Sequence, residues 1–161
     1  MPHIHEQIDF TADTFIVFHS KVLLRKHDKY KIWLPPGGHV ELNEDPNEAA
    51  IREVKEEVGL TVKLWDTRRG EKNIVDGTAS IIPPVFLNRH RINEHHEHIS
   101  FVYFAEAVDD AVQQGENEIS DEIRWFTKDD LDSSDYDIRE NIKYYAHAAL
   151  AAVGDKIIKK S

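Results

Sequence analysis

Short runs of β-branched and aromatic residues, separated by polar breaks, mark the first quarter of the chain. Thr14–Phe18 and Val22–Arg25 are two such runs with a polar triplet between them, which predicts a β-hairpin. A third short run, Lys31–Leu34, leads into Pro-Pro-Gly-Gly at positions 35–38. Prolines interrupt strand pairing, and glycines allow backbone angles that are closed to other residues. We therefore predict a loop here that brings bare backbone close to a ligand.

The next stretch has the start and stop signals of a helix over Pro46–Val58. Asp45 is a suitable N-cap, proline is favoured at the first helical position, and Glu48 completes a capping box with Asp45. Gly59 stands where helices end in the left-handed conformation. With about 100° of rotation per residue, one face of this helix is apolar and is expected to pack on a sheet. That face consists of Ala50, Ile51, Val54 and Val58.

The adjoining face of the same helix carries three glutamates, Glu53, Glu56 and Glu57. Like charges three or four residues apart destabilise a helix by roughly 0.2–0.5 kcal/mol per pair. One explanation is a solvated acidic face that pairs with Arg52 or Lys55. The other is a metal site, because carboxylate oxygens suit hard divalent cations such as Mg²⁺ and Mn²⁺. With glycines alongside, the natural ligand would be a diphosphate bridged by those ions.

The rest of the chain predicts four more strands and a second long helix. The strands are Thr61–Trp65, Ile81–Phe86, Ile99–Ala105 and Ile123–Phe126, and the amphipathic helix is Tyr136–Val153. The second strand contains two prolines and is expected at a sheet edge, whereas the third is apolar at nearly every position and is expected at the centre. This order predicts an α+β fold, an α/β/α sandwich with a mixed β-sheet flanked by helices, in a single domain over residues 1–161.

The composition of the chain limits the classes of partner that it is expected to bind. The chain has 30 acidic and 20 basic residues and a net charge of −10, which would repel a phosphate backbone, so we expect no stable nucleic-acid partner. It has no cysteine, which excludes disulfides and thiolate metal sites and fits a cytoplasmic location. The first residues do not form a signal peptide, and no apolar run approaches the ~20 residues of a membrane helix. We therefore expect no membrane association.

A longer spacing pattern surrounds the three glutamates. It consists of Gly38, five residues, Glu44, seven residues, and then Arg52–Leu60, which reads REVKEEVGL. This pattern resembles, without departure, the signature of the Nudix hydrolases, the MutT-like pyrophosphohydrolases. The residues at 33–35 (WLP) and 124–126 (RWF) also look like that family. The resemblance covers most of the chain, although only the signature is diagnostic.

The resemblance implies an enzyme that hydrolyses the pyrophosphate bond of a nucleoside diphosphate linked to another moiety, by attack of metal-activated water on phosphorus. Glu53, Glu56 and Glu57 match the glutamates that bind Mg²⁺ or Mn²⁺, and Glu97 is expected as an auxiliary metal ligand. Arg52 and Glu44 match an ion pair that orients the glutamates, which makes five catalytic residues in all. Gly37, Gly38 and His39 are expected to bind substrate.

Several alternatives stay open. The general base is expected to be Glu53 or a loop glutamate, for which Glu94, Glu97, Glu116, Glu118 and Glu122 are available. Aromatic candidates for base recognition are Trp33, Phe86 and Tyr103. The histidines at 95, 96 and 98 suggest zinc, but adjacent histidines on a strand point to opposite faces, which disfavours it. The alternative function is a nucleotide-binding regulatory module without turnover, and a homodimer is possible in either case.

Overall fold

Two long strands form the centre of the fold. The computed structural model describes residues 6–68, 76–116 and 119–154. Strands β1 (Ile8–Phe18) and β7 (His96–Ala107) run parallel, from the pair Ile8 and Glu97 to the pair Val17 and Glu106. All other described strand pairs in this eight-stranded sheet are antiparallel, so the sheet is mixed. The predicted mixed sheet is confirmed.

The remaining strands extend the sheet on both sides of this pair. They are β2 (Lys21–His27), β3 (Trp33–Leu34), β4 (Gly37–His39), β5 (Val62–Leu64), β6 (Phe86–Asn93) and β8 (Ser120–Phe126). Strand β1 pairs with β2 and β4, and β2 continues to β3 and β8. Strand β7 pairs with β5 and β6, which places it inside the sheet as the apolar run predicted.

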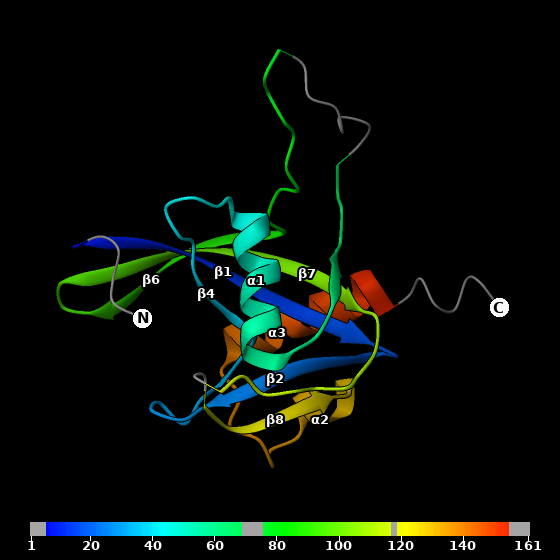
Figure 1. Cartoon of the computed structure of the whole chain (residues 1–161). Helices are drawn as coiled ribbons and strands as arrows, with labels where there is room; N and C mark the ends of the chain where they lie inside the picture. The colour runs from blue at the N-terminus through cyan, green and yellow to red at the C-terminus, as the bar shows by residue number, and fades with distance from the viewer. Residues whose placement is uncertain (1–5, 69–75, 117–118, 155–161) are drawn as a thin grey trace.

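Helices cover both faces of the sheet (Figure 1). Successive residues of a strand point to opposite faces. In β1, Ala12 and Ile16 pack in clusters with α1 (Pro46–Val58), whereas Phe15 and Val17 pack with α3 (Glu140–Ala149). A short helix, α2 (Lys128–Asp132), follows β8, and α3 continues as the π-helical turn η1 (Leu150–Gly154). The α/β/α arrangement is therefore the one that the sequence predicted.

Local signals fix α1 as expected. The Asp45 side chain accepts hydrogen bonds from the backbone N–H groups of Asn47 and Glu48, and the Glu48 side chain accepts one from Asp45 N at 2.9 Å. Gly59 ends the helix with φ of 71°. The apolar face differs at one position, because Ile51 is exposed while Ala49 is buried. The helix is thus anchored through its small residues and valines.

Three element boundaries differ most from the sequence predictions, and the loop predicted at 35–38 contains part of strand β4. Strand β1 begins at Ile8 instead of Thr14. The residues before Thr14 alternate apolar and polar side chains and pair with β7. The predicted edge strand at 81–86 begins only at Phe86, since the prolines before it cannot join a ladder. Helix α3 begins at Glu140 instead of Tyr136, which lies at a bend before the helix and packs on Phe126 with ring centroids 5.0 Å apart.

Candidate active site

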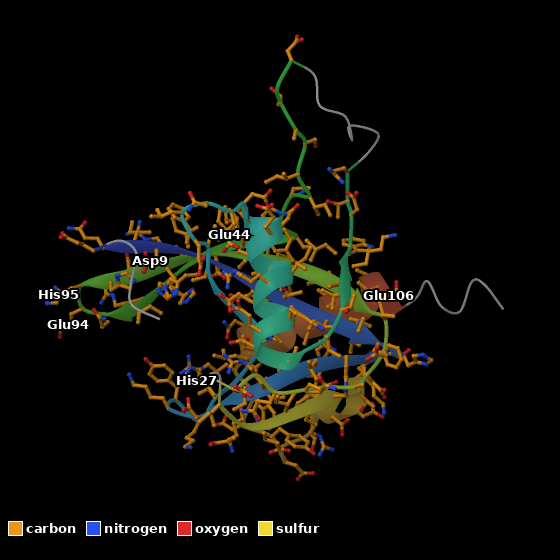
Figure 2. All side chains as sticks on the ribbon, in the orientation of Figure 1. Asp9, His27, Glu44, Glu94, His95 and Glu106 are labelled. Carbon is orange, nitrogen blue, oxygen red and sulfur yellow. The ribbon has the colours of Figure 1, made fainter. Side chains whose placement is uncertain are left out.

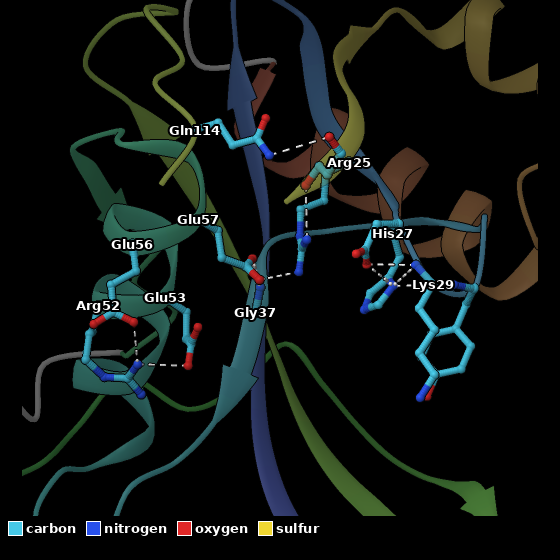
Figure 3. A network of polar contacts seen from close by, with 12 residues as sticks. Arg25, His27, Lys29, Gly37, Arg52, Glu53, Glu56, Glu57 and Gln114 are labelled. Carbon is cyan, nitrogen blue, oxygen red and sulfur yellow. Dashed lines mark hydrogen bonds and ion pairs between the residues drawn. The ribbon is translucent and has the colours of Figure 1, made fainter. Parts of the chain in front are cut away.

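Helix α1 carries three carboxylates, of which Glu53 and Glu57 face strand β4 and Glu56 lies beside Arg52 (Figure 3). Glu53 and Glu57, one turn apart, are buried although both are acidic. Glu56 lies between them in the sequence, and its side chain is 54% exposed. Burying a carboxylate is costly unless it is paired and hydrogen-bonded. The contacts of Glu53 and Glu57 therefore decide how this cluster is held.

Arg52 joins the carboxylates from the side. Its Nη1 donates to Glu53 Oε1 at 2.8 Å and to Glu56 Oε2 at 3.0 Å. Its Nε and Nη2 donate to the two oxygens of Glu44 at 3.0 and 2.6 Å, which is a bidentate pair. Its Nη2 also donates to the backbone oxygen of His39 at 3.0 Å. Arg52 thus connects Glu44, two glutamates of α1 and strand β4.

The Arg52 contacts shift the protonation of their partners. The hydrogen bonds from Arg52, the largest cause, lower the pKa of Glu44 below its ordinary value, against a smaller opposing effect of burial. The pKa of Arg52 is raised, first by its hydrogen bond to Glu44, so the guanidinium stays charged. A carboxylate that accepts such bonds remains ionised at neutral pH. The pair predicted between Arg52 and Glu44 is therefore formed in the fold and stays charged.

Glu57 has a different set of partners, which sequence reasoning missed. Arg25 on β2 donates through Nη2 to Glu57 Oε1, and both side chains are buried. Gly37 N donates to Glu57 Oε2 at 2.9 Å, and Arg25 Nη1 donates to Ser120 Oγ at 3.1 Å. Arg25 is one of several basic residues near the end of a strand, so no local pattern marks it. Its role appears only when β2 is placed beside α1.

Gly37 and Gly38 are required for space and not for an unusual backbone angle. Neither is among the described glycines with positive φ, which are Gly59 and Gly77. A Cβ at Gly38 would lie 2.3 Å from Glu53 Oε1, and one at Gly37 would lie 2.5 Å from Ala12 O. The sequence argument from backbone angles was therefore wrong for these two residues. They allow β4 to approach the Glu53 carboxylate and strand β1.

The donors of this cluster fit a hard divalent cation. All three glutamate side chains offer oxygen, the ligand atom that Mg²⁺ and Mn²⁺ prefer. Glu53 lies against the Gly38 backbone in a space that any side chain at position 38 would fill. Glu56 is exposed and open to a ligand from solvent. Glu53, Glu56 and Glu57 could thus hold a cation between α1 and β4.

Two predicted site residues have other contacts. Glu97, on β7, accepts hydrogen bonds from Arg89 on β6, of which the one from Nε is 2.8 Å long. The Arg89 contact lowers the pKa of Glu97. The His39 imidazole is directed to Asp9 on β1, with 3.3 Å between Nε2 and Oδ2. The roles of Glu97 as a metal ligand and of His39 in substrate binding stay predictions.

The loop glutamates differ in their distance along the fold from α1. Glu94 lies at the exposed turn between β6 and β7, away from α1 (Figure 2), and Glu122 is exposed on β8. Glu116 belongs to a segment that touches the end of α1. In that segment Gln113 N donates to Val58 O at 2.9 Å, and Gly115 N donates to Glu57 O at 3.4 Å. Glu118 lies outside the described residues.

The three aromatic candidates for base recognition belong to the core or its border. Trp33 and Tyr103 are buried, and Phe86 packs against the cluster that joins the sheet to α3. Phe86 and Tyr145 have ring centroids 4.8 Å apart.

A different feature beside α1 is an open groove of about 400 Å³, lined by residues of α1, β5 and the segments after β5. Asn47, Ile51, Asp66 and Arg68 are among its lining residues.

Comparisons with known proteins agree with this architecture. The sequence model of the NUDIX domain matches residues 10–148. A crystal structure of a hydrolase of the NUDIX family from Clostridium perfringens superposes with a TM-score of 0.78 at 37% identity, over 89% of this chain and 96% of that one. A MutT NUDIX hydrolase from Burkholderia pseudomallei has a TM-score of 0.63 at 21% identity, over 92% of this chain and 99% of that one, and so supports the fold alone.

Two curated proteins are also similar over part of their length. A probable DHNTP pyrophosphohydrolase from Lactococcus lactis subsp. cremoris is 31% identical over 113 residues, which is 70% of this chain and 63% of that protein. An m7GpppN-mRNA hydrolase from Xenopus laevis is 46% identical over 61 residues, which is 30% of this chain and 21% of that protein. The chain therefore spans less than two thirds of each of these relatives.

Proposed function

The chain belongs to the Nudix family of hydrolases, which act on pyrophosphate bonds, and from this premise we propose a divalent-cation-dependent reaction at Glu53, Glu56 and Glu57. In this reaction water attacks one phosphorus of a nucleoside diphosphate linked to another moiety. The observation that carries the proposal is the group of three carboxylates on α1, in which Glu53 lies against Gly38, Glu57 accepts from the Gly37 backbone, and Arg52 bonds Glu53 and Glu56. The fold does not by itself require the acidic side chains of Glu53 and Glu57 beside the glycines of β4. Binding of a cation and a diphosphate would explain why they are there.

We assign the holding of Mg²⁺ or Mn²⁺ to Glu53, Glu56 and Glu57. When bound, such a cation lowers the pKa of an attached water and neutralises charge on the pyrophosphate oxygens. Arg52 keeps the Glu53 and Glu56 carboxylates in one orientation, and Arg25 does the same for Glu57. Glu44 fixes Arg52 through two hydrogen bonds. These ion pairs pre-organise the carboxylates, which reduces the reorganisation needed in the transition state.

Glu116 is our candidate for the general base among the described glutamates. Its segment is bonded to the last turn of α1, where Glu56 and Glu57 lie, and its side chain is exposed to solvent and hence to water. Glu94 lies at the turn between β6 and β7, and Glu122 lies on β8. A base must lie within hydrogen-bond reach of the water that it deprotonates, directly or through one more water. Proximity to the cluster therefore favours Glu116 over the other two.

The substrate class follows from the relatives only in outline. One relative is named as a probable DHNTP pyrophosphohydrolase and another as an m7GpppN-mRNA hydrolase, so the two names give different substrates. For this chain we propose a small nucleotide, because a surface with net charge −10 opposes a long phosphate backbone. Nucleoside triphosphates, dinucleotides and nucleotide sugars all fit this description.

The test is a substrate panel with Mg²⁺ and with Mn²⁺. The panel contains the three classes above and a capped RNA fragment, and ¹⁸O-labelled water identifies which phosphorus is attacked. We expect cation-dependent release of a nucleoside monophosphate or of diphosphate, with label in one product. Absence of turnover with every member, together with tight nucleotide binding, would instead support the regulatory module without turnover. The cytoplasmic location, the single domain and the homodimer remain predictions, for cell fractionation, limited proteolysis and light scattering to test.

A further inference from the structure

A second cluster of ligand-type side chains lies on the face of the sheet opposite α1. We call it the histidine cluster, and it consists of Asp9, His39, His90, His96 and His98. Successive residues of β1 point to opposite faces, and Ala12 points to the face that α1 covers. Asp9 therefore points to the other face, together with Phe15, which packs with α3. The cluster occupies the end of this face beyond α3. Figure 2 shows Asp9 near that end of β1.

The strand registers bring the cluster together. Asp9 on β1 lies directly opposite His98 on β7, and His98 lies directly opposite His90 on β6. His96 stands two residues before His98 and so points to the same face. His39 on β4 lies opposite Thr11, two residues along β1 from Asp9. Side chains of β1, β4 and β7 thus converge on the Asp9 carboxylate, with His90 of β6 beside His98.

The distances within the cluster are short. His39 Nε2 and His96 Nε2 each lie 3.3 Å from Asp9 Oδ2. The possible ligand atoms of Asp9, His39 and His98 all lie within 4.8 Å of one another. The ring centroids of His98 and its neighbours His39 and His96 are 5.0 and 5.1 Å apart. One carboxylate, which is buried, is therefore surrounded by three imidazoles at nearly contact distance.

We propose that Asp9, His39 and His98, joined by His96, form a second metal site that binds a divalent transition-metal ion of the Zn²⁺ class. Zn²⁺ is bound at about 2.0–2.1 Å by imidazole nitrogen and carboxylate oxygen in tetrahedral geometry, which puts neighbouring ligand atoms about 3.3 Å apart. The distances from Asp9 Oδ2 to His39 Nε2 and to His96 Nε2 have this value, and the ligand atoms of Asp9, His39 and His98 lie within 4.8 Å of one another.

The donor set separates this site from the one on α1. Imidazole nitrogen suits Zn²⁺, Cu²⁺, Fe²⁺ and Ni²⁺, whereas Mg²⁺ prefers oxygen ligands alone. The inference does not depend on catalysis at Glu53, Glu56 and Glu57, because it uses none of those residues.

The site would connect β4, which borders the carboxylate cluster of α1, to β1 and β7. His39 follows Gly37 and Gly38 on β4, and its backbone oxygen accepts a hydrogen bond from Arg52. An ion held by Asp9, His39 and His98 would tie β1, β4 and β7 together. Metal that binds only the folded state stabilises it by mass action. We therefore expect Zn²⁺ to raise the unfolding temperature through this site.

The test measures zinc retained per chain after dialysis in excess Mg²⁺, which occupies an all-oxygen site. We expect about one zinc per chain in the wild type. Asp9→Asn and His98→Gln should each weaken zinc binding about a hundredfold and lose the rise in unfolding temperature. His95→Gln is the matched control, because His95 lies at the exposed turn of the same hairpin. Glu56→Gln is the second control, since it alters the site on α1.

Two results would overturn the second metal site. One is equal zinc retention in the wild type and in His98→Gln, which would leave a protonated His–Asp ion pair as the explanation of the geometry. The other is loss of zinc in Glu56→Gln, which would place the ion on α1. If either ligand variant fails to fold, ¹⁵N NMR of the wild-type histidine rings decides. The ring nitrogens of His39 and His98 must then shift on zinc addition, and unchanged signals would contradict the site.

Discussion

Arg25 on β2 and Glu57 on α1 form an ion pair in which both side chains are buried. The pair joins the sheet to the helix that carries the proposed metal ligands. Two further hydrogen bonds hold the pair, since Arg25 Nη1 donates to Ser120 Oγ and Gly37 N donates to Glu57 Oε2. Breaking a buried pair leaves one charge uncompensated, and this costs far more than breaking an exposed pair.

Arg25→Met should therefore destabilise the fold strongly. We expect a loss of about 3–5 kcal/mol in the free energy of unfolding, measured by urea denaturation. The matched control is Lys31→Met, because Lys31 pairs with Asp121 at 2.6 Å on the surface. That variant should lose no more than about 1 kcal/mol. Equal losses in the two variants would show that burial of the Arg25 pair has no special weight.

Alanine at the two glycines of β4 should have separable effects. At Gly38 the new Cβ meets the end of the flexible Glu53 side chain, which can move but would then leave its position. We expect turnover to fall about a hundredfold with little loss of stability. At Gly37 the Cβ meets backbone of β1, so Gly37→Ala should cost about 1–3 kcal/mol in unfolding free energy. Wild-type turnover in Gly38→Ala would contradict the close approach of β4 to the carboxylates.

The ion pair of Glu44 with Arg52 should make the free energy of unfolding depend on pH in the acid range. The pKa of Glu44 is lowered in the folded state, mainly by hydrogen bonds from Arg52. Its carboxylate therefore stabilises the fold above the unfolded pKa of about 4.5, and this stabilisation is lost as the pH falls through the lower folded value. The stability difference between wild type and Glu44→Gln should be largest above pH 5 or so and shrink in more acidic buffer.

Urea denaturation at a series of pH values measures that difference. Glu140→Gln, at an exposed position of α3, controls for the loss of one negative charge. A gap between wild type and Glu44→Gln that is constant across the acid range would mean that Glu44 is not held ionised by Arg52.

Glu116→Gln should lower kcat if Glu116 deprotonates the attacking water. General-base catalysis contributes about 10²–10⁴-fold, so we expect a loss in that range with KM little changed. Glu94→Gln serves as the control, since Glu94 lies at the exposed hairpin turn. A wild-type pH–rate profile in Glu116→Gln would remove Glu116 from the mechanism.

Helix α1 could be predicted almost residue by residue because its signals are local. The cap at Asp45, the stop at Gly59 and the spacing of the glutamates all act within a few residues of one another. The ion pair of Arg52 and Glu44 was implied by the resemblance to the family signature, and the structure forms it with two hydrogen bonds. A short-range pattern determines this part of the fold, so sequence alone sufficed.

Contacts between distant strands could not be predicted in the same way. Arg25 meets Glu57 and Asp9 meets His98 only because the sheet places β2 beside α1 and β1 beside β7. The first half of β1 was missed since its polar residues, Asp9 among them, alternate with apolar ones and break the hydrophobic run. The sequence pattern around His96 and His98 shows only their neighbours along the chain, whereas their partners Asp9 and His39 come from other strands.

The most direct test of the catalytic account is the rate of Glu56→Gln as a function of Mg²⁺ concentration. Glu56 is largely exposed, so the substitution should leave the unfolding temperature unchanged. We predict a fall in turnover of about a hundredfold or more at saturating substrate, and a higher Mg²⁺ concentration for half-maximal rate. Glu140→Gln should keep the wild-type values. Wild-type turnover and Mg²⁺ dependence in Glu56→Gln would contradict the assignment of the reaction to the three carboxylates of α1.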